Sequence, residues 1–174
     1  MRVLGIDIGT SGVKAVVAEA GDRVIAEEGV AIAVSTPHPG WSEQSPDLWC
    51  NALGEALDRL AASGALESVA GLGLSGQMLG AVLIDDAGKP VRDAILWNDQ
   101  RSLLECAALL DKVPDIGMRT NCAPDPGITA PKLMWLAAHE PDTLSRATML
   151  LLPKDYVRLW LTGEIATEPS DASG

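Results

Sequence analysis

Aromatic residues are scarce in this 174-residue sequence. Phenylalanine is absent, tyrosine occurs once and tryptophan five times. A core must therefore be built from Leu, Ile, Val and Ala with a few tryptophans, and the 47% hydrophobic content is enough for one. That content excludes an intrinsically disordered chain, and the length suits one sizeable domain.

Cysteines are few, widely spaced and odd in number. Cys50, Cys106 and Cys122 form no CxxC pair, so neither a disulfide framework nor a zinc site is predicted. Three reduced thiols fit a cytoplasmic protein.

Long apolar runs and an excess of basic charge are also missing. No stretch approaches the ~20 apolar residues that a membrane span requires, and Asp7 interrupts any signal-peptide core. Thirteen Lys and Arg against 24 Asp and Glu give a net charge of -11, which repels phosphate backbones. Membrane and nucleic-acid partners are therefore not expected. The charge itself is most simply read as favouring solubility.

The first part of the sequence predicts an antiparallel sheet. Strands are expected over residues 3–8, 13–19 and 23–33, with a hairpin turn at Gly21-Asp22. Three antiparallel strands at the start argue against a Rossmann unit, in which a helix follows the first strand.

Helices and strands then alternate. Ser45, Pro46 and Asp47 predict a helix start and Gly64 its end. The apolar face of that helix is expected to contain Leu48, Leu53, Ala56, Leu57 and Leu60. Further strands are predicted at 69–74, 81–84, 94–97 and 148–152, and further helices at 99–112, 131–139 and 153–161. This order predicts an α/β layer fold of the actin or ribonuclease-H type.

The segment 5–14 (GIDIGTSGVK) is the most informative about chemistry. Strand alternation places Asp7 on the face opposite Ile6 and Ile8. Gly9 and Gly12 let the backbone bend close to a ligand, where backbone N–H groups and the hydroxyls of Thr10 and Ser11 can surround phosphate oxygens.

Two charged residues complete this candidate site. Lys14 adds a cation, and Asp7 suits Mg²⁺, usually held through water. The segment is neither a Walker A loop nor a GxGxxG motif. The plainer alternative is a simple hairpin with a solvated Asp7.

Seven ordered motifs resemble the FGGY carbohydrate kinases, and within them the xylulose kinases. They run across essentially the whole chain: 7–14 (DIGTSGVK), 41–44 (WSEQ), 76–78 (GQM), 94–99 (AILWND), 129–133 (TAPKL), 152–156 (LPKDY) and 170–173 (SDAS).

The resemblance implies two actin-like domains with a deep cleft between them. Residues 1–174 would be the amino-terminal domain, incomplete at its C-terminal end, with the second, ATP-binding domain absent. It further implies a mixed sheet with flanking helices, ATP and Mg²⁺ as cofactors, and a cytoplasmic enzyme of xylose metabolism. Association into a homodimer stays open.

The resemblance also assigns residues. Asp7 would lie near Mg²⁺ and the transferring phosphoryl group. Phosphate binding would fall to Gly9, Thr10, Ser11 and Lys14. Sugar binding would fall to Gln77, Met78, Leu79, Trp97, Asn98 and Asp99. The other tryptophans are expected mainly in the core.

Two departures from the family pattern bear on function. Leu79 stands where xylulose kinases usually have His, so one hydrogen bond to a sugar hydroxyl is lost unless a neighbour or water replaces it. The family's catalytic-base Asp, in a Gly-Gly-Asp segment, and its adenine motif are both missing, so the 174 residues alone are expected to be inactive.

Three functions stay open at this point. The first is ATP-dependent phosphorylation of a ketopentose, D-xylulose to D-xylulose 5-phosphate, by a longer chain. The second is a kinase for another sugar or a polyol, which Leu79 suggests. The third is a non-catalytic actin-like scaffold or binding domain.

Overall fold

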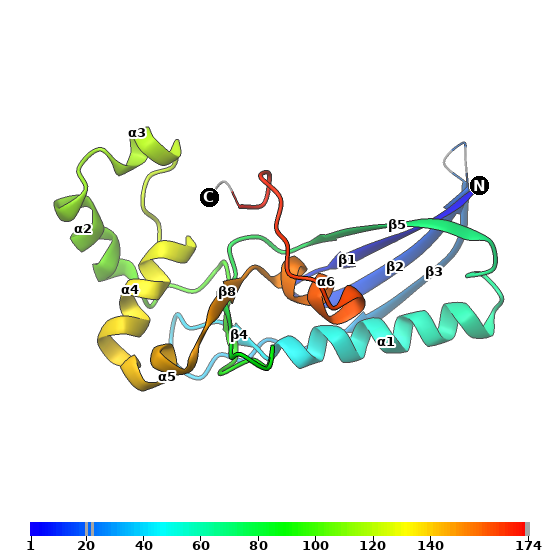
Figure 1. Cartoon of the computed structure of the whole chain (residues 1–174), viewed down its shortest axis with the longest axis horizontal. Coiled ribbons are helices and arrows are strands. Elements are labelled where there is room, and N and C mark those ends of the chain that lie inside the picture. Colours follow the sequence, from blue (N-terminus) through cyan, green and yellow to red (C-terminus); the bar gives the residue numbers. More distant parts are fainter. Residues whose placement is uncertain (20, 22, 173–174) are drawn as a thin grey trace.

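The computed structural model describes residues 1–19, 21 and 23–172. A four-stranded sheet backed by a long helix forms one end of the molecule (Figure 1). The strands are β1 (Arg2–Ile8), β2 (Gly12–Glu19), β3 (Arg23–Ala31) and β5 (Val69–Gly76), in the order β3-β2-β1-β5. β5 pairs parallel with β1, and the other pairs are antiparallel. The sheet is therefore mixed, as expected.

The core lies between this sheet and α1 (Pro46–Ala62). Leu4, Ile6 and Ile8 are buried on β1, and the residues between them face away. Leu53, Ala56 and Leu60 of α1 are buried as predicted. The prediction for Leu48 was wrong. It is 41% exposed, and Trp49 is fully buried in its place.

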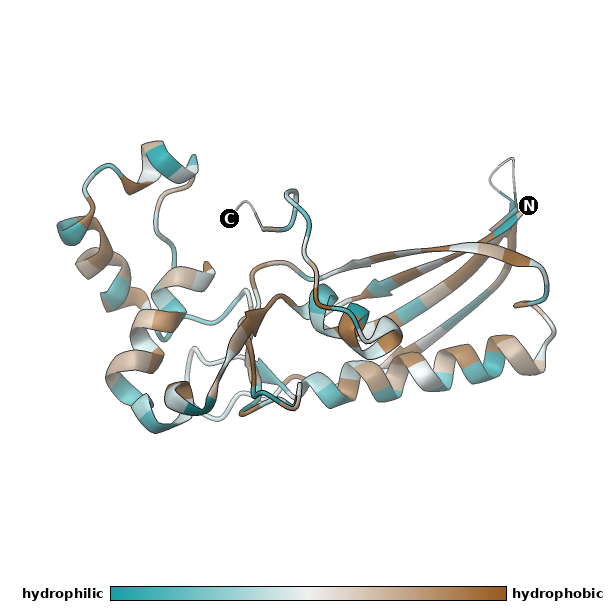
Figure 2. Cartoon of the chain, viewed as in Figure 1, coloured by the Kyte–Doolittle hydropathy of each residue, from teal (hydrophilic) through white to brown (hydrophobic). Residues whose placement is uncertain are grey.

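α6 (Pro153–Thr162) packs beside α1 and β5. Two small sheets connect the layers: β4 (Glu43–Gln44) with β7 (Ala94–Ile95), and β6 (Val82–Ile84) with β8 (Met149–Leu151). Figure 2 shows β8 as a mainly hydrophobic strand.

Four helices gather at the end of the molecule that lies farthest from the N-terminus (Figure 1). They are α2 (Leu103–Lys112), α3 (Ile116–Thr120), α4 (Thr129–His139) and α5 (Pro141–Arg146). Pro141 does not merely end α4. It occupies the first turn of α5, where its missing N–H costs nothing.

The boundaries of several elements differ from the prediction. α2 begins at Leu103, not at 99, because Asp99 and Arg101 are held in a turn described below. Ser45 precedes α1 but makes no side-chain cap bond, whereas Gly64 follows α1 in the left-handed conformation expected of a stop. The predicted hairpin turn at Gly21-Asp22 includes Asp22, and the 170–173 motif includes Ser173. Both lie outside the described residues.

Within the described residues, Cys50, Cys106 and Cys122 are free thiols. No helix in that part of the chain is long and apolar enough to cross a membrane.

Candidate functional site

The turn predicted to bind phosphate lies at one end of the sheet, between β1 and β2. Asp7 is exposed on β1, on the face away from the core, and pairs in register with Lys14 on β2. In the parallel pair it is level with Ser75 of β5, whose hydroxyl donates to Asp7 Oδ1 over 2.8 Å. The carboxylate is thus oriented by a residue 68 positions away.

Glycine is sterically required in this turn. A Cβ at Gly9 would lie 2.9 Å from the Gly12 carbonyl oxygen, and one at Gly12 would lie 2.9 Å from the Val30 carbonyl oxygen. The Gly9 N–H donates to Gly12 O over 2.9 Å, so it closes the turn and does not point to a ligand. Ser11 is exposed at the tip.

Lys14 and Thr10 have other partners. Lys14 Nζ pairs with Glu27 Oε1 at 2.8 Å on the neighbouring strand, although both side chains stay about half exposed. Thr10 Oγ1 donates to Gln77 Oε1 over 3.1 Å and accepts a bond from Trp97 Nε1 over 3.0 Å. Phosphate binding by either residue would require these contacts to rearrange.

Thr10 therefore joins the turn to the predicted sugar-binding residues. Gln77 Nε2 donates to Gln44 Oε1 over 3.1 Å, and Gln44 Nε2 donates back to Thr10 O over 2.7 Å. Trp49 Nε1 donates to the same Gln44 oxygen over 3.0 Å. This network links the turn between β1 and β2, β4, α1 and the residue that follows β5. Sequence reasoning gave no role to Gln44, although it lies in the 41–44 motif.

Three hollows follow one another from Asp7 toward the C-terminal segment. The first, of about 430 Å³, is lined by Asp7, Lys14 and Ser75. The second, of about 460 Å³, shares Ser75 and adds Met78, Leu79 and Lys154. The third, of about 510 Å³, shares Leu79 and includes Thr129. We refer to this row of adjoining hollows as the groove; Asp7 lines its first hollow, and Leu79 lines the second and the third.

Leu79 adopts an unusual backbone conformation. Its φ of 61° lies in the left-handed region, which costs a residue with a Cβ about 1–2 kcal/mol. The next position is restricted to glycine, since a Cβ at Gly80 would lie 2.6 Å from Pro153 Cγ. A strained residue at the wall of a groove is typical of functional sites.

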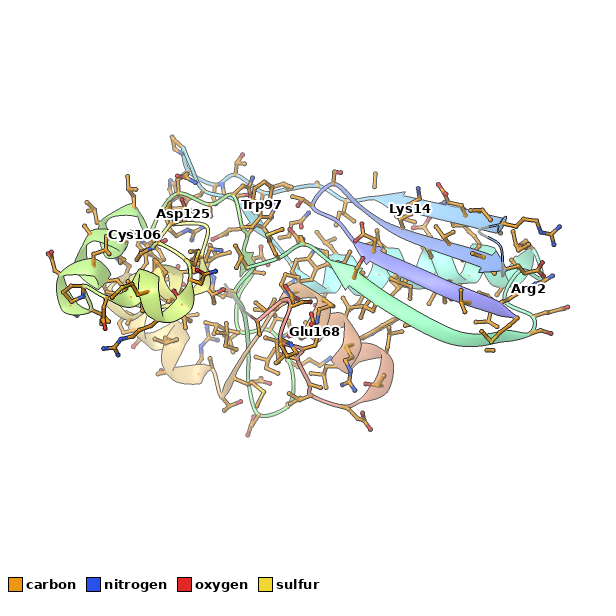
Figure 3. The ribbon with its side chains drawn as sticks, turned by 90° about the horizontal axis from the view of Figure 1, so that it is seen from above. Arg2, Lys14, Trp97, Cys106, Asp125 and Glu168 are labelled. Atoms are coloured by element: carbon orange, nitrogen blue, oxygen red, sulfur yellow. The ribbon has the colours of Figure 1, made fainter. Side chains whose placement is uncertain are left out.

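Trp97 and Asn98 are exposed, whereas Asp99 is completely buried. In Figure 3, Trp97 lies between the sheet and the loop between α3 and α4 that carries Asp125. Trp97 is 46% exposed, as expected of a tryptophan outside the core. Trp160, at 48%, departs from the expected core role.

Asp99 has a structural partner. Its Oδ2 accepts from Ser42 N over 2.6 Å and from Arg101 Nη2 over 2.7 Å, and its Oδ1 accepts from Arg101 Nε over 2.9 Å. Both oxygens are occupied and the residue has no exposed surface. This geometry does not support the prediction that Asp99 contacts the sugar. Through its bonds to Ser42 and Arg101, Asp99 instead fixes the position of the turn that contains Trp97 and Asn98.

Arg101 is the centre of this buried charge cluster. Its side chain is 1% exposed and also pairs with Glu43 at 2.7 Å. Its guanidinium lies 3.7 Å from the Trp41 ring centroid. Glu43 in turn pairs with Arg92. The cluster connects the loop before β4 to the turn after β7.

The fit of Mg²⁺ depends on Asp7. The described residues contain no group of three His, Cys, Asp or Glu side chains arranged to hold a metal. One exposed carboxylate at the groove, with an orienting hydroxyl, is still what Mg²⁺ uses when nucleotide oxygens and water complete its shell. The residues present therefore fit the ion.

Lys132 is buried behind Leu79. Burial lowers the pKa of Lys132 from 10.5 to about 7; the Arg101 charge acts in the same direction, and Asp99 and Asp125 oppose it. Because the unfolded chain binds this proton up to a higher pH than the folded chain, the contribution of Lys132 to stability should rise with pH above about 7.

We expect the difference in unfolding free energy between the native chain and Lys132→Met to grow from about pH 7 to pH 9, by up to about 1.4 kcal/mol per pH unit. Urea unfolding across this range measures it. The window stops near pH 9 because burial raises the pKa of Cys50 to about 12, and its thiol in the unfolded chain then begins to ionise. A difference that stays flat would contradict the assigned burial of a titrating amine.

The sequence and fold of this chain match known sugar kinases. The model of the FGGY family of carbohydrate kinases, N-terminal domain, matches residues 2–174. The chain is 47% identical to the xylulose kinase of Klebsiella pneumoniae over 98% of its own length and 35% of the relative's. It is 45% identical to that of Escherichia coli strain K12 over the same shares. It therefore spans about a third of the curated relatives it matches.

Solved structures agree. A xylulose kinase from Brucella ovis superposes with a TM-score of 0.96 at 45% identity, covering 100% of this chain and 37% of that one. A Plasmodium falciparum glycerol kinase with ADP has a TM-score of 0.87 at 19% identity, over 99% and 36% of the two chains, and shows the fold alone. These matches confirm the α/β, actin-like fold expected from the sequence. The chain belongs to the FGGY family of carbohydrate kinases, whose N-terminal domain it contains.

Proposed function

We propose that this domain is the sugar- and phosphate-binding part of an ATP-dependent ketopentose kinase that converts D-xylulose to D-xylulose 5-phosphate. The observation that carries the proposal is the groove, in which Asp7, held by Ser75, lines the first hollow and Leu79 lines the second and third. Phosphoryl transfer depends on holding the acceptor hydroxyl in line with the transferring phosphoryl group and its leaving oxygen, with Mg²⁺ beside the phosphates, and adjoining hollows give room for the sugar next to the phosphates.

In this proposal Asp7 holds Mg²⁺ and Ser11 contacts the phosphates. Met78, Leu79, Trp97 and Asn98 surround the sugar, and Gln77, which is buried with its amide bonded to Thr10 and Gln44, supports them. Mg²⁺ supplies charge stabilisation to the transferring phosphoryl group when bound. Thr10 fixes the phosphate-binding turn relative to the sugar-binding residues, because its hydroxyl bonds both Gln77 and Trp97.

A second domain that binds ATP and supplies the base that takes the hydroxyl proton belongs to the same proposal. The relatives named xylulose kinase are about three times as long as the matched region. Activity is therefore proposed for the intact kinase that carries this domain, and the 174 residues alone are expected to show no useful turnover.

A different sugar or polyol is the second candidate, favoured by Leu79, which offers no side-chain hydrogen bond where it lines the groove. A panel of ketopentoses, ketohexoses and polyols tested with ATP and Mg²⁺ on the intact kinase separates the two. We expect D-xylulose to have the highest kcat/KM. Preference for a polyol by tenfold or more would transfer the assignment, and phosphorylation of none of the panel would remove it.

A further inference from the structure

Lys132 is a fully buried lysine that the proposed reaction does not use. Its Nζ lies 2.7 Å from the carbonyl oxygen of Leu79 and 2.6 Å from that of Gly127. Among the described residues, no carboxylate lies within ion-pair distance of Nζ. Lysine is rarely buried without such a partner. Its role is therefore tied to the two backbone segments that it bonds.

The first of these segments is the left-handed turn at Leu79. Lys132 and Thr129 lie one helical turn apart on α4, and both donate to Leu79 O, the hydroxyl of Thr129 over 3.2 Å. Two donors from a rigid helix thus converge on the carbonyl of a residue whose φ is 61°. A conformation that Leu rarely adopts persists only when its surroundings hold it.

The second segment lies against Trp97. A Cβ at Gly127 would be 2.3 Å from the carbonyl oxygen of Trp97, so the loop and the Trp97 backbone are in close contact. Asp125 Oδ1 accepts from Gly127 N over 2.8 Å and shapes the same loop. By holding Leu79 and Gly127 together, Lys132 connects the two sides of the proposed sugar site.

The number of donors matches the number of acceptors. A neutral amine has two N–H groups, which is the number that two carbonyls accept. An ammonium has a third N–H, which is costly here because burial removes the water that would otherwise accept from it. The charged groups around Nζ are Asp99 and Asp125, which favour the ammonium, and Arg101, which opposes it together with burial.

We propose that Lys132 is a positioning residue that sets the spacing of the sugar site by holding the Leu79 turn and the Gly127 loop against α4. The inference rests on the proposed function for the identity of the ligand, but not for the positioning itself. Any opening that admits water to Nζ lets the amine take up a proton, so such openings become rarer as pH rises above about 7.

Hydrogen exchange on the intact kinase, without substrates, tests the positioning without any activity. In Lys132→Met we expect exchange in segments 77–80 and 125–128 to speed up about tenfold or more, and exchange in β1 to stay unchanged. Thr129→Val, which removes the weaker donor, should have a smaller effect in 77–80 alone. Lys112→Met, the same change at an exposed lysine on α2, is the control and should alter neither segment.

The native chain supplies a second readout that needs no substitution. After correction for intrinsic rates, protection of both segments should increase between about pH 7 and pH 9, by up to about tenfold per pH unit, and this dependence should vanish in Lys132→Met. Unchanged exchange in Lys132→Met, or protection that is flat with pH in the native chain, overturns the proposal.

Kinetics on the intact kinase links the positioning to the sugar. We expect Lys132→Met to raise the KM for the sugar about tenfold while kcat falls less, since the loosened groups contact the sugar and not the phosphates. An unchanged sugar KM alongside faster exchange refutes the role in sugar binding. If no sugar is phosphorylated by the native kinase, the proposed function fails, and the exchange data still decide the positioning.

Discussion

Replacing Asp7 by Asn is expected to lower kcat of the intact kinase about 10³-fold. The substitution keeps the size of the side chain and an oxygen for the Ser75 hydroxyl, but removes the charge that would hold Mg²⁺ beside the phosphates. Losses of this order are typical when one electrostatic contact to the transition state is removed. Steady-state kinetics with D-xylulose, ATP and varied Mg²⁺ measures the effect.

Two controls make this result specific. Asp86→Asn makes the same chemical change at an exposed acid in the turn after β6 and should leave kcat unchanged. Ser75→Ala removes the hydroxyl that orients Asp7 and should cost about tenfold, because the charge remains but its position is less restricted. Full turnover in Asp7→Asn would show that the phosphates bind elsewhere.

Replacing Arg101 by Met is expected to destabilise the chain by about 3–5 kcal/mol. Among the described residues, the guanidinium is the only cationic group within ion-pair distance of Asp99, and both side chains are almost completely buried. Removing one member of a buried ion pair leaves the other charge uncompensated, which is far more costly than losing an exposed pair. The contact with the Trp41 ring is lost as well.

Urea unfolding of the 174-residue chain measures this difference, and a matched control lies in the same helical region. Arg119 pairs with Asp115 at 2.8 Å, but the two side chains are 66% and 42% exposed, so Arg119→Met should cost less than about 1 kcal/mol. If Arg101→Met does not fold, Asp99→Asn tests the same pair by neutralising the acid. Two arginine variants of equal stability would refute the assigned role of the cluster.

The long elements were predictable because their side chains repeat with the period of the backbone. Alternation on β1 placed Asp7 on the face opposite Ile6 and Ile8, as the structure confirms. The helix at α1 was confirmed, but Trp49 is buried where Leu48 was expected to be, and Leu48 is exposed. Trp49 is the buried residue because its ring fills the core while its N–H donates to Gln44, a partner that no local sequence pattern reveals.

Three of the short elements, β4, α3 and α5, were not predicted from the sequence. β4 has two residues, α3 has five and α5 has six, too few for any periodicity to register. They exist because neighbouring parts of the chain hold them: β4 pairs with β7, which lies about fifty residues further along. Propensity is a weak guide wherever tertiary contacts supply most of the stability.

The candidate site divides in the same way. By itself the sequence determined that Asp7 faces outward beside a turn in which Gly9 and Gly12 are required, and that the chain belongs with the sugar kinases. Only the tertiary structure decided that Ser75 orients Asp7, that Asp99 forms a buried ion pair with Arg101, and that Lys132 holds the left-handed turn at Leu79. Strand alternation and turn sterics act between near neighbours and are therefore written in local order. Partners separated by dozens of residues depend on sheet register and on which polar groups burial forces together, and those are settled only when the whole chain packs.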